Sequence, residues 1–351
     1  MCPYSCCYCF ILNLQETLLK KKAKAGLMPY TTETLKLLLD SAFNRKKESL
    51  NPTVLALRNG LPVIIGRKCE PFCEFERETN STHQTLELLK DYDVPTVVET
   101  KVPMFFDRYY KILSEMKAGV NVTITPGDDE LSKKLSEPSS YSERWRFVRE
   151  LKDVGLWVGI TGEPIISGVN DDTFMLEEWA DNAFSLKVSH VNFGDFRISN
   201  LKLTSQRMKQ AGFDITQIVA AKKRTWIQKG KEIFRILHKR NLLATSPDWI
   251  NFGLINDTES CCGFNGLTFK FHCFTFQHAL LDVKRNRRTR FNDVFKHNIF
   301  GDSVVGKFRD IWNGKSGYFN LSDVKGVSKI GYDGEGNVIY GVPRGLKEAF
   351  N

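Results

Sequence analysis

The strongest constraint on the fold of this chain is a unit that recurs from residue 62 onward. Each unit contains a short β-rich apolar run, a polar loop and an amphipathic segment, and the apolar runs lie at residues 62–66, 95–100, 120–125, 156–161 and 190–193. Successive runs start about 30 residues apart, which is the length of a strand with its crossover helix. Five strands that alternate with helices predict a parallel sheet with the helices packed outside it.

Local signals place the helices between these strands. The pairs Ser81 with Gln84 and Ser140 with Glu143 have the capping-box pattern of a helix start. Two aspartates suit helix N-caps and two glycines suit helix ends: Asp171, Asp172, Gly119 and Gly155. A further helix is expected over residues 31–43, ahead of the first strand.

The array of strands and helices extends to about residue 200, and a portion of mixed character follows. We therefore expect a barrel domain over residues 1–200 and an extension over residues 201–351 that closes the barrel and contacts substrate. Hydrophobic residues form 42% and charged residues 26% of the 351, which excludes a largely disordered chain. No run of about 18 apolar residues and no signal-peptide pattern occur, so the sequence predicts a cytoplasmic protein without a membrane span.

The nine cysteines are concentrated at the N-terminus, where four of them fall within the first nine residues. Cys2, Cys6 and Cys9 have C-x3-C-x2-C spacing, which lets one loop direct three thiolates at a single cluster, with Cys7 as a bystander. Three protein ligands leave one iron of a [4Fe–4S] cluster with an open position, and substrate chemistry at a metal needs such a position. A zinc loop or packed cysteines are the alternatives; zinc sites usually combine a C-x2-C pair with a second pair of cysteines or histidines.

This loop, with Tyr8 before its last cysteine, resembles the C-x3-C-x-Y-C signature of the radical SAM superfamily. The resemblance implies a partial (β/α)6 TIM-type barrel, a [4Fe–4S] cluster and bound S-adenosylmethionine (SAM). It further implies that SAM is cleaved reductively to methionine and a 5′-deoxyadenosyl radical, which abstracts hydrogen from a substrate. An electron donor such as flavodoxin or ferredoxin would supply the electron.

Four later segments are similar, in order, to one branch of this superfamily, the spore photoproduct lyase-like proteins or DNA repair photolyases. They are residues 58–76, 98–101, 123–135 and 162–171, which contain Glu70-Pro71-Phe72, Lys101, Thr123-Ile-Thr125 and Pro164-Ile-Ile166. The similarity implies that Cys2, Cys6 and Cys9 bind the cluster and that Tyr8 packs near the adenine. It also implies that Lys101 and Thr123 contact the methionine carboxylate or the ribose, and that Pro164 and Ile166 place backbone and apolar surface against the cofactor.

The sequence departs from this branch in two places. The cluster loop of the superfamily follows the first barrel strand, whereas Cys2 follows Met1 directly, so we expect a truncated chain or a barrel that lacks its first strand. The spore enzyme is understood to quench its product radical with a cysteine three residues before the D-P of its loop. The matching residue here is Arg67, and Cys69, two residues further on, is the candidate hydrogen-atom donor in its place.

The other cysteines leave several hypotheses open. Cys73, Cys261, Cys262 and Cys273 are candidates for a second iron–sulfur or metal site, and Cys262 is an alternative hydrogen-atom donor. Free cysteines are also common as small buried apolar residues.

The net charge of +9 includes basic runs at residues 20–22, 222–224 and 284–290. The last run lies near five phenylalanines: Phe269, Phe271, Phe274, Phe276 and Phe291. Basic groups among aromatic rings suit a nucleic acid, and a solvated face over core phenylalanines is the alternative. The main hypothesis is therefore a spore photoproduct lyase-like radical SAM enzyme that acts on DNA or another nucleotide-containing molecule. The alternatives are a radical SAM enzyme that modifies RNA or protein, and a nucleic-acid-binding protein with structural metal.

Overall fold

The structure, a computed structural model, describes residues 2–11, 31–44, 51–198, 200–254, 256–258, 283, 288–295, 309–315, 321 and 327–341. These residues form two compact units. The first contains 2–11, 31–37, 62–252 and 256–258, and the second contains 38–44, 51–61, 253–254 and the described residues from 283 onward. Within these ranges, no helix combines the length and apolar character that a membrane crossing requires.

The first unit is built on a sheet of six parallel strands whose order in space follows the sequence. The strands are β1 (Val63–Ile65), β2 (Thr96–Thr100), β3 (Ala118–Thr123), β4 (Trp157–Ile165), β5 (His190–Asp195) and β6 (Ala244–Thr245). Their register pairs Val98 with Val120 and Val122 with Ile160, so the apolar centres of neighbouring strands lie side by side. This α/β arrangement of sequential parallel strands is a partial TIM-type barrel, as the sequence predicts.

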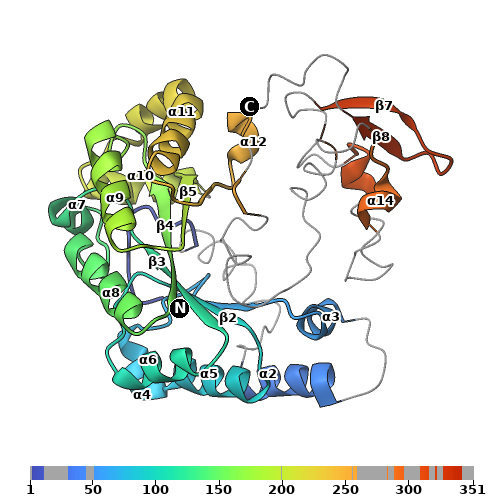
Figure 1. The fold of residues 1–351 in the computed structure, drawn as a ribbon. Helices are drawn as coiled ribbons and strands as arrows, with labels where there is room; N and C mark the ends of the chain where they lie inside the picture. The colour runs from blue at the N-terminus through green and yellow to red at the C-terminus, as the bar shows by residue number, and fades with distance from the viewer. Residues whose placement is uncertain are drawn as a thin grey trace. The chain divides into compact units, whose positions relative to one another are not determined.

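Helices cover the outer face of this sheet (Figure 1). Those in the first unit are α4 (Glu74–Thr79), α5 (Ser81–Asp91), α6 (Asp107–Ser114), α7 (Asp129–Lys134), α8 (Tyr141–Asp153), α9 (Thr173–Ser185), α10 (Leu201–Gln210), α11 (Ile215–His238) and α12 (Trp249–Phe252). Helix α2 (Thr32–Leu39), with the π-helical segment η1 (Asp40–Asn44), occupies the range of the helix expected over residues 31–43.

The core lies between the sheet and these helices. Trp179 of α9 is fully buried and donates its indole N–H to the carbonyl oxygen of Ile124 at 2.8 Å, which ties the helix layer to the end of β3. Phe193 of β5 contacts Phe234 of α11 and Phe252 of α12 through ring pairs 5.1 and 6.1 Å apart. These aromatic contacts fix α11 and α12 against the last strands.

All five predicted strands are confirmed, and β4 extends four residues beyond its predicted end. The expected helix start at Ser140 is also confirmed, because Ser140 and Glu143 form both hydrogen bonds of a capping box. The helix end at Gly155 is confirmed by its position after α8 and its φ of 78°. Asp172 accepts from Phe174 N–H as the N-cap of α9.

Two predicted helix boundaries are wrong. Ser81 is the first residue of α5 and makes no capping bond to its backbone; the Glu76 carboxylate accepts the N–H groups of Thr82 and His83 in its place. Gly119 lies inside β3 and does not end a helix, because α6 already ends at Ser114.

The cysteine loop precedes the sheet. Among the described residues before Val63, which are 2–11, 31–44 and 51–62, no strand is present. The strand β6 was not predicted, and it pairs with β5 through Val191 with Ala244 and Asn192 with Thr245. The domain boundary at residue 200 stays a prediction.

The second unit contains α3 (Pro52–Arg58), α14 (Phe291–Phe295) and the antiparallel pair β7 (Ser328–Tyr332) and β8 (Val338–Gly341). Arg58 donates to the carbonyl oxygens of Ser41 and Ala42 at 2.9 and 2.8 Å, which attaches α3 to η1. Trp312 donates to Val338 O at 2.6 Å and its own carbonyl accepts from the hydroxyl of Tyr340 at 2.7 Å. These bonds make a small core around the hairpin.

Candidate active site at the cysteine loop

A cavity of about 560 Å³ lies at the C-terminal ends of the barrel strands. In a parallel barrel, this is the end at which the loops carry the working residues. One wall is the cysteine loop, which contributes Cys2, Tyr4, Cys6, Tyr8, Cys9 and Phe10. The other walls are the strand ends, which contribute Gly66, Cys69, Glu70, Lys101, Thr123, Glu163, Pro164, Asn192 and Asp195 among others. The topology therefore brings the three predicted cluster ligands and four of the five predicted SAM contacts, Tyr8, Lys101, Thr123 and Pro164, to one cavity.

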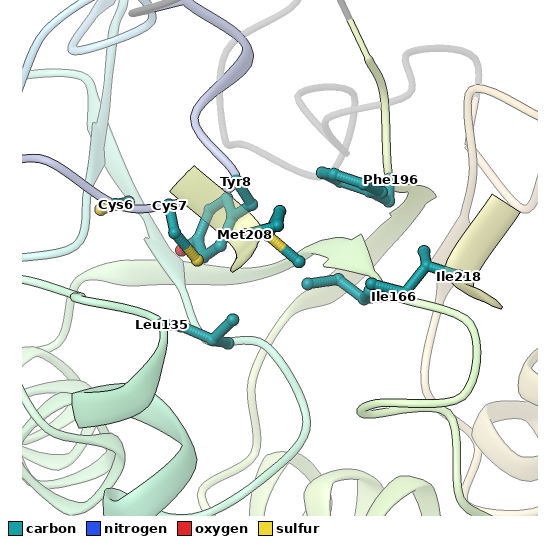
Figure 2. Close-up of a cluster of buried hydrophobic side chains, with 8 residues drawn as sticks. All are labelled: Cys6, Cys7, Tyr8, Leu135, Ile166, Phe196, Met208 and Ile218. Carbon is teal, nitrogen blue, oxygen red and sulfur yellow. The ribbon is translucent and has the colours of Figure 1, made fainter. Parts of the chain in front are cut away.

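The two adjacent cysteines of the loop differ in their access to the cavity. Both belong to a buried hydrophobic cluster with Leu135, Ile166 and Met208, but of the two only Cys6 also lines the cavity. Figure 2 shows Cys7 close to Tyr8 and Leu135, while the sulfur of Cys6 points away from this cluster. The backbone supports this arrangement, because Cys9 N–H donates to Cys6 O at 3.0 Å and Cys7 N–H donates to Leu135 O at 3.1 Å.

Both thiols are strongly protonated in the absence of metal. Burial raises the pKa of Cys6 to about 12, against the opposing effect of the Lys101 ammonium. Burial likewise raises the pKa of Cys7 to about 12. Because a metal binds the thiolate, its binding at Cys6 must displace a proton.

The donor set of three thiols fits an iron–sulfur cluster. No three Cys, His, Asp or Glu side chains among the described residues lie close enough together to bind one metal ion. A zinc ion needs its thiolates in one coordination sphere, with Zn–S distances of about 2.3 Å. An iron–sulfur cluster binds each thiolate through a different iron, so its ligands stand further apart. Three thiols spread over one cavity wall suit the second arrangement.

A buried network of polar side chains connects the cysteine loop to the barrel wall. Tyr8 donates its hydroxyl to Glu137 and accepts from the Lys101 ammonium at 2.9 Å. Lys101 also lies 5.0 Å from the centroid of the Tyr8 ring, a cation–π contact. Glu137 in turn forms a fully buried ion pair with Arg144 of α8.

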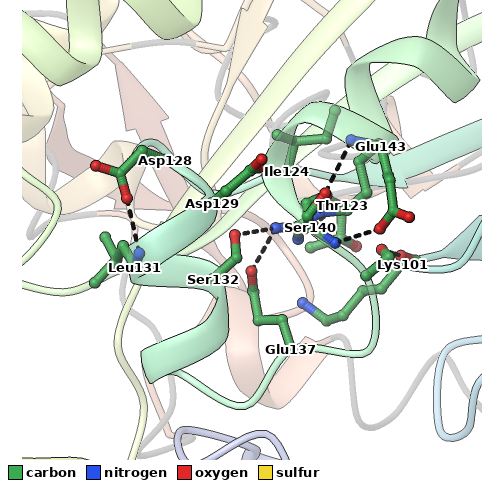
Figure 3. A network of polar contacts seen from close by, with 12 residues as sticks. Lys101, Thr123, Ile124, Asp128, Asp129, Leu131, Ser132, Glu137, Ser140 and Glu143 are labelled. Atoms are coloured by element: carbon green, nitrogen blue, oxygen red, sulfur yellow. Dashed lines mark hydrogen bonds and ion pairs between the residues drawn. The ribbon is translucent and has the colours of Figure 1, made fainter.

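Arg144 is held by three further acceptors. It donates to the carbonyl oxygen of Thr123 at 3.1 Å, to the hydroxyl of Ser132 at 2.8 Å and to the carbonyl oxygen of Ser140 at 3.2 Å. Figure 3 shows Ser132, Glu137 and Ser140 close together, with the side chain of Lys101 extending toward Glu137. Burial acts to raise the pKa of Glu137, but the charges of Arg144 and Lys101 outweigh it and lower that pKa. Glu137 is therefore ionised at neutral pH.

The backbone of Lys101 is fixed by a second buried carboxylate. Glu70 accepts the N–H of Lys101 at 2.8 Å, the hydroxyl of Thr100 and the N–H of Phe72 at 3.3 Å. Burial raises the pKa of Glu70, although these hydrogen bonds act in the opposite direction. The loop after β1 is thus attached to the end of β2 at the residue predicted to contact SAM.

The opposite wall of the cavity, at the ends of β4 and β5, carries different groups. Glu163 accepts from the amide of Asn192 at 2.9 Å, and Asp195 forms an ion pair with Lys222 of α11. Burial raises the pKa of Asp195 to about 6, against the opposing effect of Lys222. The second oxygen of Asp195, Oδ1, is buried and has no hydrogen-bond partner among the described residues.

The remaining predicted site residues are placed as follows. Thr123 and Pro164 line the cavity, whereas Ile166 is fully buried in the hydrophobic cluster beneath the cysteine loop. Cys69 lines the cavity and is exposed, and Cys73 is partly exposed at the start of α4. Cys261, Cys262 and Cys273 lie outside the described residues, so the second metal site stays a prediction. The same holds for the basic runs at residues 20–22 and 284–287.

Sequence reasoning missed Glu137, Arg144, Glu163, Asn192 and Asp195. Glu137 and Arg144 carry no local motif, because their pairing depends on the turn that brings α8 back against α7. Asn192 and Asp195 stood in a strand end that was already expected to face the cavity. The alternation of polar with apolar residues there was the available signal.

Comparison with solved structures identifies proteins of similar fold. The chain aligns with a double variant of spore photoproduct lyase with bound AdoMet and dinucleoside spore photoproduct, at 14% identity and a TM-score of 0.50, covering 70% of this chain and 73% of that one. It also aligns with SuiB from Streptococcus suis at 14% identity and a TM-score of 0.48, covering 77% of this chain and 51% of that one.

The chain spans about half the length of the SuiB structures that it matches, which include complexes with SAM and with the precursor peptide SuiA. No family model and no curated protein sequence matches the chain. At these identities, the likeness to spore photoproduct lyase shows the fold: this chain has the same partial-barrel architecture.

Proposed function

We propose that the chain is a radical SAM enzyme whose [4Fe–4S] cluster is bound by Cys2, Cys6 and Cys9. The observation that carries this proposal is the shared cavity: all three cysteines of the C-x3-C-x2-C loop line it together with Lys101 and Thr123. The partial-barrel fold and the resemblance of four sequence segments support the same conclusion.

When bound, the cluster and SAM supply the 5′-deoxyadenosyl radical that abstracts hydrogen from a substrate. The side chains of the protein bind and orient SAM. The Lys101 ammonium suits the SAM carboxylate, and the Thr123 hydroxyl suits a carboxylate or ribose oxygen. Pro164 offers backbone and apolar surface at the cavity, and Ile166 supports the loop from beneath.

Tyr8 has a second role beside the one that the resemblance implies. Its ring lines the cavity, where it is available to pack near an adenine, but its hydroxyl is committed to Glu137 and Lys101. We therefore propose that Tyr8 both contacts the cofactor and holds the loop in place.

The proposed substrate is DNA or another nucleotide-containing molecule, with Cys69 as a hydrogen-atom donor at the cavity. The resemblance to the spore photoproduct lyase-like branch and the position of Cys69 support this choice. Modification of RNA or protein by the same radical chemistry is the second candidate. Flavodoxin or ferredoxin is the proposed electron donor, and a reducing cytoplasm suits the six described cysteines, all of which are free thiols.

The decisive experiment compares Cys6→Ala with Cys7→Ala after anaerobic reconstitution of the full chain with iron and sulfide. The wild type and Cys7→Ala are expected to bind about four irons per chain and to release 5′-deoxyadenosine from SAM after reduction with dithionite. Cys6→Ala is expected to bind no cluster and to release no 5′-deoxyadenosine. Like Cys7→Ala, it removes one thiol, at the neighbouring position of the same loop. A wild type that holds the cluster but releases no 5′-deoxyadenosine would contradict the proposal.

The iron measurement also tests the two remaining hypotheses. About eight irons per chain would indicate a second cubane that uses Cys73 with the later cysteines, whereas about four would exclude it. One tightly bound zinc per chain, with no iron–sulfur absorption, would favour the alternative of a nucleic-acid-binding protein with structural metal.

A further inference from the structure

The hydrogen bonds of the polar network behind the cysteine loop can run in only one direction, because its side chains differ in whether they donate or accept. An ionised carboxylate only accepts hydrogen bonds, and an ammonium or guanidinium only donates them. Tyr8 must therefore donate its single hydroxyl proton to Glu137 and receive Lys101 on its oxygen lone pairs. The chain of bonds runs from Lys101 through Tyr8 to Glu137, where it meets the donor Arg144 from the other side.

The burial of this network makes it a rigid support. The side chains of Glu137 and Arg144 are inaccessible to solvent, and Tyr8 is 6% exposed. A buried ion pair of this kind holds its geometry because either charge left alone would be strongly destabilising. Tyr8 and Lys101 are the members of the network that line the cavity, and Lys101 is the charged one of the two.

The same short segment also holds the backbone of the cysteine loop. Leu135, whose carbonyl accepts from Cys7 N–H, is two residues before Glu137, and both follow helix α7 directly. Segment 135–137 therefore supports the loop at two points, one on the backbone and one through the Tyr8 side chain. The charges that meet here, two cations and one carboxylate, leave one positive charge toward the cavity.

We propose that Glu137 and Arg144 are positioning residues, which act through the Tyr8 hydroxyl to hold the Lys101 ammonium where it binds the carboxylate of the SAM methionine group. This inference rests on the proposed function, because SAM is the ligand that it concerns. Under this proposal, two residues outside the cavity make the cavity selective for a ligand that bears a carboxylate. It also explains why a tyrosine, with its hydroxyl, stands before the third cysteine.

Tyr8→Phe tests the proposal with the smallest change, because it removes one hydroxyl and keeps the ring. The measurement is equilibrium binding of SAM and of decarboxylated SAM to the anaerobically reconstituted, unreduced full chain. Wild type is expected to prefer SAM, and Tyr8→Phe is expected to bind SAM about tenfold more weakly, which corresponds to about 1.4 kcal/mol. Binding of decarboxylated SAM is expected to change by less than a factor of two or so, since it offers Lys101 no carboxylate.

Tyr110→Phe is the matched control, because Tyr110 on α6 donates to Glu150 on α8 at 2.9 Å, outside the barrel. It is expected to bind both ligands as the wild type does. Glu137→Gln is expected to reproduce the selective loss seen for Tyr8→Phe. The thermal unfolding midpoint of the apo chain reports whether it folds, and if it does not, Tyr8→Phe alone decides.

Two results would overturn the inference while the proposed function stands. The first is a Tyr8→Phe chain that binds SAM as tightly as the wild type. The second is an equal loss of affinity for SAM and for its decarboxylated analogue, which would indicate a merely structural hydroxyl. A wild-type chain that holds the cluster but binds no SAM would overturn both the inference and the proposed function.

Discussion

The two walls of the cavity differ in how completely their polar groups are paired. At the ends of β2 and β3, the buried charges Glu70, Glu137 and Arg144 each have two or more hydrogen-bond partners. At the C-terminal end of β5, Oδ1 of Asp195 is buried without a partner among the described residues, and so is Nδ1 of His190 at the opposite end of the same strand. The charged groups of the first wall are therefore fully paired, whereas strand β5 retains unpaired polar atoms.

This difference indicates which buried groups keep their ionisation state and which groups change it with their surroundings. Glu137 keeps its charge because Arg144 and Lys101 compensate its burial, whereas burial raises the pKa of Glu70 in spite of its hydrogen bonds. Partly paired groups shift toward the neutral form, as His190 and Asp195 do. We therefore expect that stability is lost in the first wall when a charged group loses its partner, and that stability depends on pH in strand β5.

Loss of a partner in the first wall is expected to have the largest effect. Arg144→Met leaves the buried carboxylate of Glu137 without its main counter-charge and is expected to lower the free energy of unfolding by about 3–5 kcal/mol. The double variant Arg144→Met/Glu137→Leu removes both charges and is expected to lose less than the single variant. Urea unfolding of the apo chain measures both, and a double variant that is less stable than the single one would contradict the account.

Close packing of the same wall predicts a second, smaller effect. Gly66 follows β1 with φ 98°, and a Cβ added there would lie 1.9 Å from the carbonyl oxygen of Glu99 on β2. Gly66→Ala is therefore expected to cost about 2–4 kcal/mol from backbone strain and overpacking together. Gly155→Ala is the control, since Gly155 has φ 78° but no described atom within 4 Å of the added Cβ. Equal losses in urea unfolding would show that the contact with Glu99 contributes nothing.

The contrast between the walls also explains which features the sequence predicts. The strands could be predicted because a parallel strand buried on both faces is a continuous apolar run, as at Val97 and Val98. Strand β6 was missed because its two residues, Ala244 and Thr245, are too short for a pattern. The cysteine loop was recognised as a cluster site from its spacing and from the resemblance that it carries.

The features that the sequence did not predict depend on contacts between distant segments. Ser81 was wrongly predicted to cap α5. The actual cap is the carboxylate of Glu76 in the preceding helix, which local capping rules do not include. The pairing of Glu137 with Arg144 has the same origin: a buried arginine looks in sequence like any other charge on an amphipathic helix. Tyr8 was predicted from its motif, but its partners were visible only in the fold.

The smallest net effect on stability is expected in strand β5, where two groups act in opposite directions as the pH changes. Burial lowers the pKa of His190 from 6.5 to about 3, so the folded chain keeps the imidazole neutral while the unfolded chain protonates it below pH 6.5. Stability is therefore expected to fall with decreasing pH below 6.5, by up to about 1.4 kcal/mol per pH unit from this group. His190→Asn is expected to flatten that slope in unfolding experiments between pH 4 and 7.

Asp195, whose pKa is raised from 3.8 to about 6, contributes with the opposite sign, because the stability gained by its protonation is lost as pH rises through 6. Asp195→Asn is accordingly expected to steepen the acid slope, and a change in the same direction as His190→Asn would contradict the assignment of unpaired polar groups to this strand.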